Sequence, residues 1–235
     1  MYTGFFIEPP FFELGPKAYI YGEESLVLAR YADKISWKYR VPIIYTPQYV
    51  DIPMIARKVK HIFVFAQHMD PLKAGRGNGS VLPEAIRAAG ASGVLLNHAE
   101  KKIPKEVLQQ TIQRAGEIKL ATLVCADTLK EAVEVAKLEP NIIIAEDPEL
   151  IGVGKRKEND KEVIHRINEE VWRIDPRIRI LHGAGISNGK DVYKIIAAGA
   201  QAAGSTSGVL NAPDPLSMLE EMIRSAREAW DATHI

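Results

Sequence analysis

A carboxylate and a glycine-containing loop follow a short, strongly apolar run of the sequence. Residues 142–144 are three consecutive isoleucines, which is typical of a strand buried on both faces of a parallel sheet. Glu146 comes where this strand should end, Pro148 disfavours helix there, and Gly152 and Gly154 close the following loop. A lone acid at a strand end under a hinged loop is what proton abstraction beneath a lid requires. The alternative is a solvated glutamate in an ordinary turn, with a solvent-exposed charged loop after it.

Other polar residues also follow apolar runs that we interpret as strands. Lys17 comes after the first run, Gln67 after the third, and His98 and Glu100 after the fourth. Histidine can donate or accept a proton near neutral pH, and lysine supplies a positive charge. If the fold brings these strand ends together, the residues would form an acid–base site around a small anion. For His98 the alternative is a histidine whose hydrogen bonds are satisfied within its loop.

Glycine and hydroxyl residues gather after the last two predicted strands, in the stretches HGAG and GSTSG. Glycines allow a ligand to approach the backbone closely, and hydroxyl and backbone N–H groups near a helix start bind phosphate. In parallel α/β barrels the phosphate site often lies at these late loops. The predicted phosphate-binding residues are Gly152, Gly183, Gly185, Ser205, Thr206 and Ser207.

Strand-like and helix-like patterns alternate along the whole sequence, and these elements must position the residues above. Strands are predicted at residues 11–14, 41–45, 62–66, 93–96, 120–125, 142–144, 178–181 and 200–204. Amphipathic helices are predicted at residues 23–39, 52–59, 83–89, 105–118, 129–137, 162–174, 190–198 and 215–230. Eight such units close a single (β/α)8 barrel, here over residues 1–235 as one domain, and the active site of such a barrel lies where strands end and helices follow.

Composition narrows the classes of partner. The chain has 235 residues, 46% of them hydrophobic, and its 30 basic residues balance 30 acidic ones. This balance gives no net field toward nucleic acid or a membrane surface, so we expect a small-molecule partner. The single cysteine, Cys125, excludes an internal disulfide framework, and no signal peptide is evident. We therefore expect a cytoplasmic location, and no cofactor or metal, because the histidines show no metal-ligand spacing.

Six stretches of the sequence resemble one family closely. They are FAQHMD, VLPEAIRAAGASG, VLLNHAE, AEDPELIGVG, LHGAGIS and STSGV. In these stretches the chain resembles the triosephosphate isomerases, in the short form found in archaea or a close paralogue of it. The resemblance runs from about the second strand to the last helix and implies the same TIM barrel.

The resemblance also implies roles for four residues. Glu146 matches the base of the family, His98 the electrophile, and Lys17 a fixed positive charge, while Glu100 matches the acid of the same turn as His98. The implied reaction interconverts dihydroxyacetone phosphate and glyceraldehyde 3-phosphate through an enediolate. This family is itself a standard example of pKa tuning, so these roles come from the resemblance rather than from residue spacing. Relatives also suggest a homo-oligomer, either a tetramer or a dimer.

Departures from the family pattern keep alternatives open. Gly15 stands where the family has Asn, and the alignment that assigns Lys17 needs a gap, whereas an ungapped alignment puts Gly15 at the lysine position. Gly204 to Thr206 replaces a bulkier run, so a paralogous isomerase of a four-carbon phosphosugar such as erythrulose phosphate is one alternative. A second is an aldolase or lyase that uses Lys17 as a Schiff base. A third is a phosphosugar-binding protein without turnover.

Overall fold

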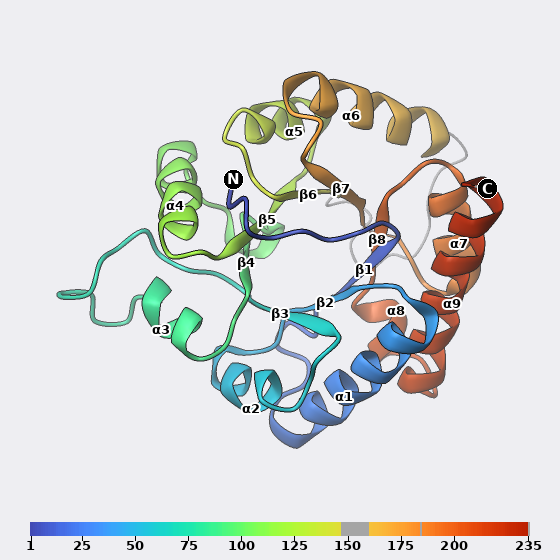
Figure 1. Ribbon diagram of the computed structural model, residues 1–235, viewed down its shortest axis with the longest axis horizontal. Coiled ribbons are helices and arrows are strands. Elements are labelled where there is room, and N and C mark those ends of the chain that lie inside the picture. The colour runs from blue at the N-terminus through green and yellow to red at the C-terminus, as the bar shows by residue number, and fades with distance from the viewer. Residues whose placement is uncertain (147–159, 184, 235) are drawn as a thin grey trace.

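Parallel strands close into a barrel in sequence order, with β8 pairing back to β1 (Figure 1). The computed structural model describes residues 1–146, 160–183 and 185–234. The strands are β1 (Phe11–Leu14), β2 (Ile43–Tyr45), β3 (Ile62–Ala66), β4 (Gly93–Leu96), β5 (Ala121–Ala126), β6 (Ile142–Ala145), β7 (Arg179–His182) and β8 (Ala202–Gly204). The predicted (β/α)8 barrel is therefore confirmed.

Helices surround this barrel on its outside, as Figure 1 shows. They are α1 (Gly22–Tyr39), α2 (Ile52–Ala56), α3 (Pro83–Ala88), α4 (Lys105–Glu117), α5 (Leu129–Ala136), α6 (Asp160–Ile174), α7 (Gly189–Ala197), α8 (Ser207–Leu210) and α9 (Pro215–Thr233). Two short 3-10 turns, η1 (Tyr49–Asp51) and η2 (Ala99–Lys101), follow β2 and β4. Among the described residues no helix is both long and apolar enough to cross a membrane.

All eight predicted strands and all eight predicted helices are found, and apart from the short helix α8, which was not predicted, the differences lie at their ends. The prediction for β2 began at Val41, but the backbone N–H of Val41 donates to the carbonyl of Ser36 and so closes α1 instead. In the same way Ala200, predicted as the start of β8, donates to the carbonyl of Ile195 in α7. Apolar residues that cap a helix look like strand residues in the sequence, and this is why both boundaries were wrong.

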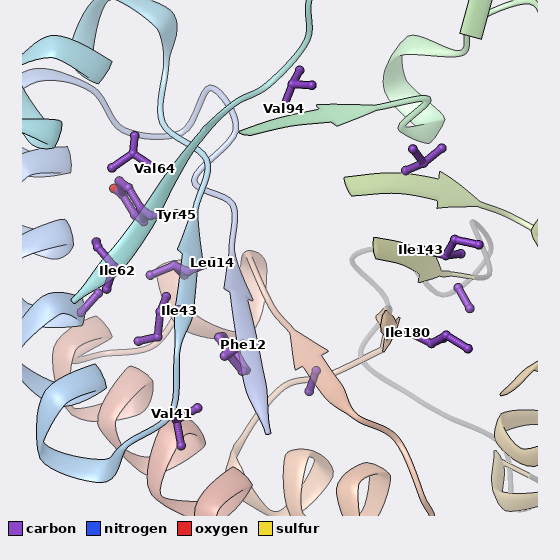
Figure 2. Packing of buried hydrophobic residues seen from close by; sticks show 14 of the residues in the cluster. Phe12, Leu14, Val41, Ile43, Tyr45, Ile62, Val64, Val94, Ile143 and Ile180 are labelled. Atoms are coloured by element: carbon purple, nitrogen blue, oxygen red, sulfur yellow. The ribbon is translucent and has the colours of Figure 1, made fainter. Parts of the chain in front are cut away.

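Alternation along each strand separates the apolar core into two parts. Phe12 and Leu14 of β1 belong to a large cluster between the barrel and the helices, part of which Figure 2 shows. Phe11 of the same strand belongs to a smaller cluster that fills the inside of the barrel. Because successive side chains of a strand point to opposite faces, Glu13 lies on the inward face with Phe11.

The N-terminal segment closes one end of the barrel. It crosses that end before entering β1 (Figure 1), and Ile7 is part of the interior cluster. The ring of Phe5 meets the rings of Phe63 and Phe65 edge to face, with centroids 5.1 and 5.6 Å apart. The side-chain amide of Asn141 also donates to the carbonyl of Tyr2 at 2.8 Å. This end of the barrel interior is therefore apolar and closed.

At the other end of the barrel the inward-facing positions turn polar or lose their side chains. Six inward positions lie two residues beyond an interior apolar residue of their own strand, and all six line one pocket. They are Glu13, Thr46, Gln67, Glu146, Gly183 and Gly204. The barrel therefore presents a ring of polar groups and gaps at the carboxyl ends of its strands, where barrel enzymes have their active sites.

Candidate active site

The pocket at the carboxyl ends of the strands has a volume of about 290 Å³, which suits a small molecule. Nine of the ten predicted site residues line it, and they come from loops that are far apart in the sequence. These are Lys17, His98, Glu100, Glu146, Gly183, Gly185, Ser205, Thr206 and Ser207. Gly152, the tenth, lies outside the described residues, as does the charged loop predicted to act as a lid.

Glu146 and His98 face each other across this pocket. Oε2 of Glu146 is 3.9 Å from Nε2 of His98, and both side chains are largely buried, at 18% and 16% exposure. The backbone N–H of Glu146 donates to the carbonyl of Ala126 at 3.0 Å, so the β5–β6 pairing continues to this residue. The sheet itself therefore positions the carboxylate, and the carboxylate and the imidazole are close enough to contact the same small molecule.

The hydrogen bonds of His98 define its chemical form. Its Nδ1 accepts the backbone N–H of Glu100 at 3.1 Å, so this nitrogen carries no proton. A neutral ring then has its proton on Nε2, the atom that faces Glu146. Burial lowers the pKa of His98, and the nearby charge of Lys17 lowers it further. The imidazole is thus a neutral hydrogen-bond donor aimed into the pocket.

Asn97 holds the turn that presents His98. It has a left-handed backbone conformation, with φ of 60°, which asparagine adopts more readily than most residues. Its side-chain amide donates to the carbonyl of Cys125 at 2.9 Å and to Glu131 at 2.8 Å, and its Oδ1 accepts the N–H of Ile103 at 3.1 Å. These bonds tie the loop after β4 to β5 and α5 and fix the direction of the histidine.

Lys17, in the loop after β1, reaches the turn that contains His98 and Glu100. Its ammonium group is 2.8 Å from Oε1 of Glu100, and its side chain is 23% exposed. The backbone at Lys17 is left-handed, with φ of 50°, and its carbonyl accepts the side-chain amides of Gln48 at 2.7 Å and Gln67 at 2.9 Å. Two neighbouring strand ends therefore hold the lysine loop in place, a role that was not predicted for Gln67.

The neighbour of Lys17 bears on the Schiff-base alternative. Lysines that form Schiff bases are activated by apolar surroundings or by a second cation. Lys17 instead contacts the carboxylate of Glu100, and this pair lowers the pKa of Glu100. The aldolase or lyase alternative is therefore not favoured.

The two late loops pack tightly against each other and against the loop after β1. The hydroxyl of Ser205 donates to the carbonyl of Ile186 at 2.9 Å, and that of Thr206 donates to the carbonyl of Gly15 at 2.6 Å. A β-carbon at Gly208 would lie 2.5 Å from the carbonyl oxygen of Ile186, so a glycine is needed there. Two of the three predicted hydroxyl donors are thus already engaged within the loops.

Glu13 also lines the pocket, although it was not predicted as a site residue. This residue is 9% exposed, and its Oε1 accepts the hydroxyl of Thr46 at 3.0 Å. Burial raises the pKa of Glu13 to about 7, with a smaller contribution from the charge of Glu146. The signal was present in the sequence, since Phe11 and Glu13 are two residues apart in one strand and must share a face.

The chain is similar to known proteins over most of its length. The family model of triosephosphate isomerase matches residues 17–224. A triosephosphate isomerase of Sulfurisphaera tokodaii is 38% identical over 96% of this chain and 99% of its own length. Those of Methanothermus fervidus and Methanobacterium bryantii are 38% and 36% identical, over 86% and 92% of this chain and 91% and 96% of theirs.

Proposed function

Since the chain belongs to the triosephosphate isomerase family, we propose that the pocket at the carboxyl ends of its strands interconverts dihydroxyacetone phosphate and glyceraldehyde 3-phosphate. The observation that carries this proposal is the approach of a carboxylate and a neutral imidazole to 3.9 Å, in the pair of Glu146 and His98. The enzyme is an intramolecular aldose–ketose isomerase.

In the proposed mechanism Glu146 removes a carbon-bound proton next to the substrate carbonyl. The electron pair of the broken C–H bond forms the C=C bond of an enediolate while the carbonyl π pair moves onto the oxygen, and the Nε2–H of His98 donates to that oxygen. The same carboxyl then returns the proton to the former carbonyl carbon. The hydroxyl proton passes from the oxygen of the first carbon to the oxygen of the second, and the imidazole of His98 is the group proposed to carry it. A neutral imidazole suits this role because its Nε2–H points into the pocket while Nδ1 is occupied by the N–H of Glu100.

Lys17 and Glu100 are proposed to act together beside this pair. The ammonium group of Lys17 supplies a positive charge for the anionic substrate and for the enediolate. Glu100 positions two groups, since its carboxylate contacts Lys17 at 2.8 Å and its backbone N–H holds His98 at 3.1 Å. We therefore assign Glu100 as a positioning residue rather than as a proton donor.

The substrate phosphate is proposed to bind at the late loops. Gly183 and Gly185 leave room for close backbone approach, and the hydroxyl of Ser207, unlike those of Ser205 and Thr206, makes no hydrogen bond with the described residues. We expect backbone N–H groups of these loops and the hydroxyl of Ser207 to make the direct contacts. The hydroxyls of Ser205 and Thr206 then shape the site by holding the loops together.

Turnover measured with both triose phosphates and with erythrulose phosphates tests the proposed function. We expect higher kcat/KM for dihydroxyacetone phosphate and glyceraldehyde 3-phosphate than for the four-carbon compounds. A preference for the four-carbon substrates would assign the chain to a paralogous activity. Tight binding of a phosphorylated ligand without turnover of any of them would instead indicate a binding protein.

Three further properties are proposed with this function. We propose that residues 1–235 form one barrel domain, because β1 to β8 all belong to one closed sheet. We also propose a homo-oligomer, tetramer or dimer, because the segment between β3 and α3 reaches away from the barrel (Figure 1). Finally, we propose a cytoplasmic location. Light scattering in solution and cell fractionation test the last two.

A further inference from the structure

Gly15 and Glu13 compete for the same space at the floor of the pocket. A β-carbon on Gly15 would lie 2.6 Å from Oε1 of Glu13 and 2.9 Å from Oγ1 of Thr46. On the other side, a β-carbon on Gly204 would lie 3.2 Å from Oε2 of Glu13. The carboxyl group is therefore held between two glycines, and any side chain at position 15 would displace it. A side chain such as that of Asn therefore does not fit at position 15 beside Glu13 as it is placed here.

The hydrogen bonds of Glu13 show where a proton would sit on its carboxyl group. Oε1 accepts the hydroxyl of Thr46, so a protonated carboxyl carries its hydrogen on Oε2. Oε2 is the oxygen on the side of Gly204, which lines the pocket together with Glu13. A protonated Glu13 therefore has one O–H donor available at the floor of the active site.

The charged groups around Glu13 come from two other parts of the pocket. Glu146, at the end of β6, disfavours a second negative charge, and Lys17, in the loop after β1, favours one. Burial outweighs both and raises the pKa of Glu13 to about 7. The carboxyl group therefore changes its protonation state near neutral pH.

We propose, on the basis of the proposed function, that Glu13 binds the substrate as a protonated carboxyl group, donating a hydrogen bond from Oε2 to an oxygen on the reacting carbons. Glu13, in β1, thus supplies a hydrogen-bond donor, which Gly15 cannot do because it has no side chain. In the ionised form Glu13 has no donor and repels the anionic substrate and the enediolate. Substrate binding thus depends on whether the carboxyl group of Glu13 carries a proton. This proton is distinct from those of Glu146 and His98.

Two substitutions separate this role from a purely structural one. Glu13→Gln keeps a hydrogen-bond donor of the same shape and cannot ionise, whereas Glu13→Leu keeps the volume without any donor. Glu134→Gln is the matched control, because it makes the same chemical change on α5, in a residue that pairs with Lys105 outside the pocket. Thermal melting of each variant reports whether the fold is intact.

The measurement is the affinity for 2-phosphoglycolate and for inorganic phosphate at pH 6 and pH 8. With a pKa of about 7 for Glu13, wild-type affinity for phosphoglycolate should fall about tenfold more between these pH values than that of Glu13→Gln. Glu13→Leu should bind phosphoglycolate at least about tenfold more weakly than wild type at pH 6, and inorganic phosphate equally well. Glu134→Gln should follow wild type throughout.

Parallel pH curves for wild type and Glu13→Gln would overturn the proposal, even if Glu13→Leu does not fold. So would unchanged phosphoglycolate affinity in a folded Glu13→Leu variant. The proposed function fails separately, if wild-type protein does not turn over triose phosphates. Because the ligand measurements need no turnover, they still decide the role of Glu13 in that case.

Discussion

The two ends of the barrel interior are built from the same strands and have opposite chemistry. On β1, Phe11 faces the closed end and is fully buried, whereas Glu13, two residues later on the same face, lines the pocket. On β6, Ile142 and Ile144 lie in the interior cluster, and Glu146 follows on the same face. On each of these strands, a side chain packed in the core and a side chain that lines the pocket are therefore only two residues apart.

The two ends of the barrel interior have opposite effects on the stability of the fold. Carboxyl groups removed from water destabilise a fold in their charged form, and the raised pKa of Glu13 reflects this cost. The closed end holds aromatic and aliphatic side chains from β1 to β8 and from the N-terminal segment, which stabilise the barrel on burial. Substitutions at the two ends should therefore affect different properties.

The largest effect is expected at the pocket end, for Glu146→Gln. An amide cannot accept the carbon-bound proton, so kcat should fall by about 10³- to 10⁴-fold. KM should change little, because the side chain keeps its shape. Steady-state kinetics with glyceraldehyde 3-phosphate measure both constants, and melting should show a stability near that of wild type. A variant with nearly normal kcat would remove Glu146 from the mechanism.

At the closed end, Phe65→Ala should lower stability and leave kcat nearly unchanged. Phe65 is fully buried, and its ring packs against Phe5 and Gly93. Truncation should lower the free energy of unfolding by about 3–5 kcal/mol. Denaturant titration measures this loss, and kcat per folded molecule should stay near the wild-type value at low temperature. A selective loss of kcat in folded protein would mean that the two ends are not separable.

A third prediction concerns the pH dependence of stability at the pocket end. The folded state holds the proton of Glu13 up to about pH 7, whereas the unfolded chain releases it near the ordinary glutamate pKa of 4.5. Between these pH values the folded state binds more protons, so its stability falls as pH rises, by up to about 3 kcal/mol for this group. Denaturant titrations at pH 5 and pH 8 should show a smaller fall for Glu13→Gln. An equal fall in both proteins would contradict the assignment.

The smallest effect is expected for Lys17→Met. Loss of one charged contact should raise KM for triose phosphate by about tenfold. Lys105→Met is the control, because Lys105 pairs with Glu134 outside the pocket. Unchanged kinetics in Lys17→Met would favour the ungapped alignment, in which Gly15 takes the lysine position.

The sequence predicts the pocket better on some strands than on others, for physical reasons. The barrel follows from alternating apolar runs and amphipathic helices, and Glu146 stands out because it interrupts a run of isoleucines. Glu13 does not stand out, since it lies inside the predicted strand, where its inward direction appears only from the alternation with Phe11. The short helix α8 was also missed, because a glycine–hydroxyl stretch of four residues carries no helical periodicity.

The most direct test of the central claim is exchange of the carbon-bound protons of dihydroxyacetone phosphate with deuterium in D2O, followed by nuclear magnetic resonance. Wild-type protein should exchange a single proton next to the carbonyl as it forms glyceraldehyde 3-phosphate, and Glu146→Gln should leave the substrate protonated over the same period. Exchange at the wild-type rate in Glu146→Gln, or none in the wild type, would contradict the claim that the Glu146 and His98 pair carries out proton transfer.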